Sequence, residues 1–159
     1  MAMHTWFECK IRYEKVMENG MQKKVTEPYL VDALSFTEAE ARIIEEKTPF
    51  ISGEFTVSDI KRANYSELFP SDEESADRWF KCKLIFITLD EKSGAEKKTS
   101  TQVLVQAADL RDAVKKLDEG MKGTMADYQI GMVSETPLMD VYPYSAEPND
   151  KPEFDPSKA

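Results

Sequence analysis

Two stretches of the chain, residues 6–14 and 79–87, alternate between apolar and polar positions. One face of each stretch carries the residues that we assign to a core: Phe7, Cys9, Ile11, Tyr13 and Phe80, Cys82, Leu84, Phe86. Successive side chains of a β-strand point to opposite faces, so a period of two predicts a half-buried strand at each place. The turn sequences MENG and DEKSG follow, and each places a glycine where a hairpin needs a positive φ. A second strand is therefore expected around each of the apolar triplets 29–31 and 103–105.

A helical pattern follows each of these hairpins. In the first, Ser35 and Thr37 each stand three residues before a glutamate, which is the spacing of a capping box. In the second, Asp109 precedes apolar residues at helical spacing, and the helix is expected to end near Gly120 or Gly123.

Each helical pattern is followed by a third strand, predicted at 53–60 and at 127–133. A last apolar patch then ends in Pro70 in the first case and in Pro143 in the second. The spacing of these patches fits either a fourth strand or a turn of helix.

The predicted elements occur twice along the chain in the same order. The chain has two tryptophans and two cysteines, and all four fall in the pentapeptides WFECK (6–10) and WFKCK (79–83), 73 positions apart. Further matches follow in order along both halves, which is the signature of an internal repeat. The predicted fold class is α+β: an internal duplication of a ββαβ(β) unit, with antiparallel sheets that each carry one helix, related by a pseudo-twofold axis.

The repeat divides the chain into four parts. Residues 1–70 form the first repeat unit, 71–77 an acidic connector, 78–144 the second unit and 145–159 a polar, proline-containing tail. About 70 residues make a marginal core, so both units are expected to combine in one compact domain. The chain is then a monomer with an internal pseudo-twofold axis or a homodimer.

The charge distribution limits the kinds of partner. The net charge is −9, and the connector and the tail supply −6 of it. A salt-driven grip on nucleic acid needs a basic excess, which is missing here. No apolar run is long enough to cross a membrane, and no secretory signal is visible, so we expect a cytoplasmic protein without a membrane partner.

Candidate catalytic groups are few. The only histidine, His4, lies near the terminus, where it is a poor general base. Cys9 and Cys82 fall on core faces, where a free cysteine acts as a small hydrophobe rather than a nucleophile or a zinc ligand. The carboxylate pairs, those of 71–77 included, are read as solvated surface. We therefore predict no catalytic residues, no metal site and no cofactor.

One surface has the composition of a ligand-binding face. Its candidate residues lie on the outer faces of the two first strands: Trp6, Lys10, Arg12, Trp79, Lys81 and Lys83. Aromatic and basic side chains on an exposed sheet can stack bases and contact phosphates. An ordinary solvated face with tryptophan at the rim of the core is the simpler interpretation, because Glu8 and Glu14 interrupt the patch.

The segments WFECKIRYEK, KKVTEPYLVDALSFTEAEARI, ITLDEKSGAEKK and EGMKGTMADYQIGMVSETPLMDVYPY resemble a bacterial and phage family labelled as domain of unknown function 4494. The resemblance covers about residues 5–144. It implies a small intracellular protein, of mobile-element origin, and it supplies no activity, cofactor or catalytic residue.

The functional expectation is a non-enzymatic binding or adaptor module that presents a pseudo-symmetric surface or groove to a protein partner. The alternative is single-stranded nucleic-acid binding through the Trp/Lys/Arg face. An enzyme that works with carboxylates alone is the third interpretation.

Overall fold

The computed structural model describes residues 5–143 and divides them into two compact units. Unit 1 comprises residues 5–62 and 141–143, and unit 2 comprises residues 63–140. The tail 145–159 and His4 lie outside the described residues.

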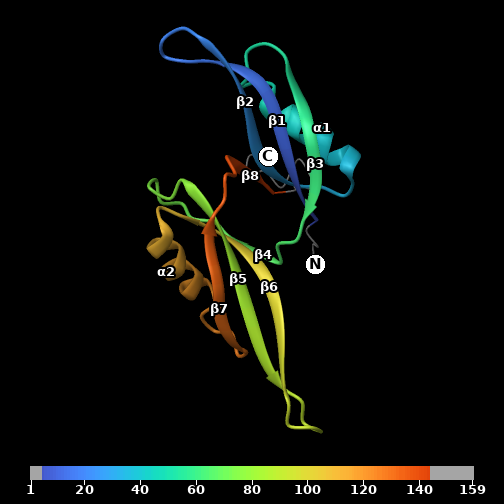
Figure 1. Ribbon diagram of the computed structural model, residues 1–159, viewed down its shortest axis with the longest axis vertical. Helices are drawn as coiled ribbons and strands as arrows, with labels where there is room; N and C mark the ends of the chain where they lie inside the picture. The colour runs from blue at the N-terminus through green and yellow to red at the C-terminus, as the bar shows by residue number, and fades with distance from the viewer. Residues whose placement is uncertain (1–4, 144–159) are drawn as a thin grey trace, which may run out of the picture. The chain divides into compact units, whose positions relative to one another are not determined.

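Unit 1 is a four-stranded sheet with one helix (Figure 1). Its elements in chain order are β1 (Trp6–Val16), β2 (Gln22–Asp32), α1 (Phe36–Lys47), β3 (Phe55–Ala63) and β8 (Asp140–Tyr142). The strand order is β3-β1-β2-β8, and β1 pairs with β2 as an antiparallel hairpin from Trp6↔Asp32 to Val16↔Gln22. Gly20 in the turn has φ 82°, the positive value expected there.

Unit 2 is also a four-stranded sheet with one helix. Its elements are β4 (Glu67–Phe69), β5 (Arg78–Leu89), β6 (Glu96–Ala107), α2 (Leu110–Gly120) and β7 (Asp127–Glu135). The strand order is β4-β6-β5-β7, with β5 antiparallel to β6 and β7, and β4 parallel to β6. The β5–β6 hairpin runs past the last β5–β7 pair, Ile87↔Asp127, so its end is a two-stranded ribbon (Figure 1).

Each of the short strands β4 and β8 pairs in the sheet that is built mainly from the other half of the sequence. β4 follows β3 along the chain but pairs with β6, while β8 follows β7 along the chain but neighbours β2. In both sheets the short strand therefore occupies the edge beside the second strand of the hairpin. Each sheet is completed by the final strand of the opposite half of the sequence, an arrangement that we call the strand exchange.

The helix of each unit covers one sheet face and buries a separate apolar cluster. In unit 1 the cluster includes Phe7, Cys9 and Ile11 of β1 with Ala39 and Ile43 of α1. The corresponding cluster of unit 2 has these buried members: Phe80, Cys82, Leu84, Val103, Val105, Ala107, Ala113, Leu117 and Met121. The alternation in the sequence thus identified the helix-facing residues correctly.

The helices begin where the capping signals predict. The backbone N–H of Glu38 donates to Ser35 Oγ, so Ser35 rather than Thr37 is the N-cap of α1. The N–H of Asp112 donates to Asp109 Oδ1 in the same way, and α2 ends at Gly120. The final apolar patches, left open between strand and helix, are the strands β4 and β8. The α+β class, with two mainly antiparallel sheets and two helices, is confirmed.

Candidate functional site

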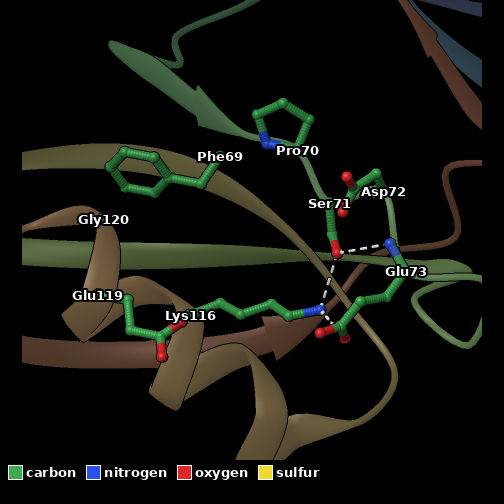
Figure 2. Close-up of a pocket in the computed structure, with 8 residues that line it drawn as sticks. All are labelled: Phe69, Pro70, Ser71, Asp72, Glu73, Lys116, Glu119 and Gly120. Atoms are coloured by element: carbon green, nitrogen blue, oxygen red, sulfur yellow. Dashed lines mark hydrogen bonds and ion pairs between the residues drawn. The ribbon is translucent and has the colours of Figure 1, made fainter.

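An open pocket of about 710 Å³ lies in unit 2, where the chain leaves β4 and crosses α2 (Figure 2). Phe69 at the end of β4 and the following residues form one side, and the last two turns of α2 form the other. The lining residues are Phe69, Pro70, Ser71, Asp72, Glu73, Lys116, Glu119 and Gly120.

Lys116 ties the two sides of this pocket together. Its Nζ donates to Ser71 Oγ at 2.9 Å and to Glu73 Oε1 at 2.8 Å, as the dashed lines of Figure 2 show. On its own helix, the same Nζ lies 3.1 Å from Asp112 Oδ2. The Lys116 side chain is 14% exposed and that of Glu73 is 60% exposed, so the ion pair spans the pocket edge. We call Lys116 with Ser71 and Glu73 the lysine clamp.

These contacts keep Lys116 charged. Partial burial acts to lower its pKa, but the hydrogen bonds to Glu73 and Asp112 outweigh burial and raise the pKa above its usual value. Asp112 accepts a hydrogen bond from the N–H of Ala108, and this bond together with Lys116 lowers the Asp112 pKa. A nucleophilic lysine needs a depressed pKa, so Lys116 is suited to positioning the chain and not to covalent chemistry.

The remaining pocket surface is acidic and apolar. Asp72, Glu73 and Glu119 are exposed, and the ring of Phe69 lies against Gly120 in the same pocket. The three carboxylates outnumber the single ammonium group of Lys116, which binds only Glu73 among them. The pocket therefore favours a cationic group next to an apolar one.

Unit 1 has a counterpart of the lysine clamp at the corresponding place. Arg42 stands 74 residues before Lys116, the same offset that relates Ala39 to Ala113. Arg42 Nη1 donates to the backbone carbonyl of Asp32, and Nη2 donates to the carbonyl of Pro143 at 3.1 Å. Each helix thus uses one basic side chain to hold the segment that follows the exchanged strand.

The residues predicted for a ligand face are not gathered on an open surface. Trp6 and Trp79 are 3% and 5% exposed, so their rings are not available for stacking in this structure. Arg12 is exposed, while Lys10, Lys81 and Lys83 are half-buried. The bulky aromatic part of the expected face is thus enclosed.

Both cysteines lie in the helix-facing cores, as the sequence predicted. Cys9 and Cys82 are fully buried and unpaired. Burial raises the pKa of Cys82 to about 11, and burial together with the nearby acids Glu8, Asp59 and Glu40 raises the pKa of Cys9 to about 12. Such thiols are inert near neutral pH. Within residues 5–143, no group of three or more histidine, cysteine or carboxylate side chains is arranged to hold a metal ion.

Sequence reasoning missed the lysine clamp. The acids of the 71–77 segment are exposed, as expected for the acidic connector. The contacts of Ser71 and Glu73 with Lys116, the hydrogen bond from the N–H of Ser71 to Gln106 Oε1 and the burial of Ala76 were not predicted. The available signal was the basic residue at one helical position of both repeats, Arg42 and Lys116.

A family model described as "Domain of unknown function (DUF4494)" matches residues 5–144. The chain belongs to this family. The match includes every strand and helix of both units, so the pocket and the clamp lie within the family domain. No curated protein and no solved structure matches the chain. Among the described residues of this family member, no helix is long and apolar enough to cross a membrane.

Proposed function

We propose that the chain is a non-enzymatic binding module that takes a short protein segment in the unit 2 pocket. The segment carries a lysine or arginine beside an apolar side chain. The observation that supports the proposal is the pocket itself: exposed carboxylates of Asp72, Glu73 and Glu119 line the same pocket as the half-buried ring of Phe69. A basic group meets the rim, and an apolar neighbour covers the ring.

The lysine clamp supports this function by fixing the pocket wall before a ligand arrives. Two hydrogen bonds of Lys116 hold Ser71 and Glu73 against α2, and its contact with Asp112 fixes the lysine on the helix. A wall that is already ordered loses less conformational entropy on binding, so more of the contact energy becomes affinity.

We also propose that the two halves arose by internal duplication. The matching order of the two sheets, the equivalent N-caps and the equivalent basic residues Arg42 and Lys116 support this origin. Under this proposal the halves have diverged at the pocket. Gly120 of α2 leaves room for the Phe69 ring, whereas the position 74 residues earlier in α1 is Glu46.

The test is selection of peptides from a randomised display library by the intact chain. We expect the selected peptides to share a basic residue next to an apolar one and to bind more weakly as the salt concentration rises. The pocket variant Asp72→Lys/Glu119→Lys should bind them at least about tenfold more weakly, a loss of roughly 1.4 kcal/mol.

The matched control is Glu91→Lys/Glu96→Lys, which makes the same change of charge on exposed residues of the β5–β6 ribbon. This control should retain the affinity of the unchanged chain. Selection of acidic peptides, or equal binding by the pocket variant and the control, would contradict the proposed function.

A further inference from the structure

The end of the β1–β2 hairpin exposes apolar side chains to water, and burying them against a partner would be favourable. Val16 and Met21 are 65% and 66% exposed, and Met17 is 40% exposed. We call residues 15–24 the unit 1 tip. Unit 2 repeats part of the feature, because Leu89 stands 73 positions after Val16 and is 68% exposed.

The unit 1 tip also places like charges opposite each other. Lys15 pairs in register with Lys23 across the antiparallel hairpin, next to the pair Val16↔Gln22. Directly opposed like charges destabilise a β-ribbon. Lys15 Nζ lies 3.9 Å from Glu27 Oε2, which offsets part of this repulsion. Glu14 pairs with Lys24 in the next position, so the excess of positive charge at the tip is carried by Lys15 and Lys23, and a partner with carboxylates would reduce it.

The tip has a defined backbone shape. The N–H of Met17 donates to the carbonyl of Met21 at 2.8 Å, the N–H of Gly20 to the carbonyl of Met17 at 2.9 Å, and the N–H of Met21 to Asn19 Oδ1 at 3.0 Å. The apolar and basic side chains are therefore presented on a closed turn. A preorganised element of this kind binds with little entropic loss.

The chemistry that completes this tip is present in the same chain. The unit 2 pocket combines the carboxylates of Asp72, Glu73 and Glu119 with Phe69, and with Lys116 included its charge is still negative. The unit 1 tip combines the exposed residues Val16, Met17 and Met21 with three lysines, Lys15, Lys23 and Lys24, and one acid, Glu18, so its charge is positive. Charges of opposite sign next to apolar side chains make the two surfaces complementary.

We propose that the unit 1 tip of one copy docks in the unit 2 pocket of a second copy. This inference rests on the proposed function, because it names the segment that the pocket takes. The contact joins two different surfaces, so it is head-to-tail, and each added copy leaves one tip and one pocket open. The chain therefore self-associates in a series that grows with protein concentration and shortens as salt is added.

The experiment is sedimentation velocity of the full chain and two variants, alone and mixed. The tip variant is Met17→Glu/Met21→Glu, and the pocket variant is Asp72→Lys/Glu119→Lys. We expect the unchanged chain to form species larger than a monomer as its concentration rises. Each variant alone should remain monomeric, and an equimolar mixture of the two should form a heterodimer, because each retains the surface that the other has lost.

Formation of the heterodimer also shows that both variants are folded. The proposal is overturned if the unchanged chain stays monomeric over the whole concentration range, if a single variant self-associates as the unchanged chain does, or if the mixture forms no heterodimer. Binding of the chain to vesicles of anionic lipid that is lost in the tip variant would assign the tip to a lipid surface instead and would also overturn it.

The peptide selection separates this inference from the proposed function. If the unchanged chain is monomeric yet binds selected basic–apolar peptides through the pocket, self-docking fails and the proposed function stands. If the pocket variant loses neither peptide binding nor self-association, both fail.

Discussion

The ring of Phe69 lies so close to Gly120 that a Cβ atom at residue 120 would stand 2.9 Å from both Cδ1 and Cε1 of the ring. Phe69 ends the exchanged strand β4, and Gly120 ends α2. The glycine is therefore needed for close approach and not for an unusual backbone angle. It joins a strand from the first half of the sequence to a helix from the second half.

Gly120→Ala should destabilise the protein, because the new methyl group forces the Phe69 ring out of its place. Overpacking of this kind lowers the free energy of unfolding by about 1–3 kcal/mol, and the better helix propensity of alanine offsets about 0.5–1 kcal/mol of this loss. We expect a net loss of roughly 1 kcal/mol in the free energy of unfolding, measured with denaturant. Lys115→Ala, on an exposed position of the same helix, is the control and should change stability little. An unchanged or higher stability of Gly120→Ala would show that the ring does not rest on this residue.

The lysine clamp should hold the segment after β4. Lys116→Met keeps the aliphatic stem but removes the ammonium group that binds Ser71 and Glu73. Hydrogen exchange of the amides in 67–76 should become faster, while the amides of β5 should keep their protection. Lys115→Met is the matched control, since that side chain is exposed. Equal exchange in both variants would mean that the segment is held by other contacts.

The buried thiols should make stability fall in alkali. Cys9 and Cys82 keep their protons up to pKa values of about 12 and about 11 in the folded state, against 9.0 for an unperturbed thiol. Their contribution is complete below pH 9.0 and is lost as the pH rises toward about 11 for Cys82 and about 12 for Cys9, because only the unfolded chain releases these protons in that range.

Denaturant unfolding across this pH range should therefore give a shallower slope for Cys9→Ala/Cys82→Ala than for the unchanged chain. Tyr29, whose pKa is raised by burial and by Glu27, is present in both proteins, so the difference in slope isolates the thiols. Identical slopes would indicate that the cysteines are accessible to water in the folded state.

The buried tryptophans should be insensitive to ligands that act by stacking. Because Trp6 and Trp79 are 3% and 5% exposed, their fluorescence should be shifted to short wavelength and quenched little by iodide. Addition of single-stranded oligonucleotides at low salt should leave the emission unchanged. Quenching by oligonucleotide that weakens as salt is added would instead support the nucleic-acid alternative.

The periodic parts of the fold could be predicted from the sequence because local patterns determine them. The alternation of Phe7, Cys9 and Ile11 identified the core face of β1, and the capping chemistry at Ser35 and Asp109 located the start of each helix. These signals depend on a few neighbouring residues, so they can be recognised without the tertiary structure.

The strand exchange could not be predicted in this way. β4 and β8 have three residues each, and the second strands of the two hairpins offer similar apolar edges, Tyr29–Leu30–Val31 and Val103–Leu104–Val105. Nothing local distinguishes one edge from the other. The lysine clamp was missed for the same reason, because Glu73 and Ser71 lie 43 and 45 residues before Lys116 in the sequence.

The tryptophans show a further limit of periodicity. Alternation places Trp6 and Trp79 opposite the helix-facing residues, and Leu30 and Leu104, which lie outside the helix-facing clusters, are fully buried as well. A period of two assigns a side chain to a face. Whether that face is covered depends on tertiary structure, which a strand pattern does not encode.

The strand exchange defines which segments complete each sheet, and backbone NOEs measured by NMR test it most directly. The register pairs Leu68 with Leu104 in parallel strands. We predict interstrand NOEs from 67–69 to 103–105 and none to 29–31. NOEs that connect Leu68 to Leu30 instead would show that β4 completes the sheet of its own half and would contradict the exchange.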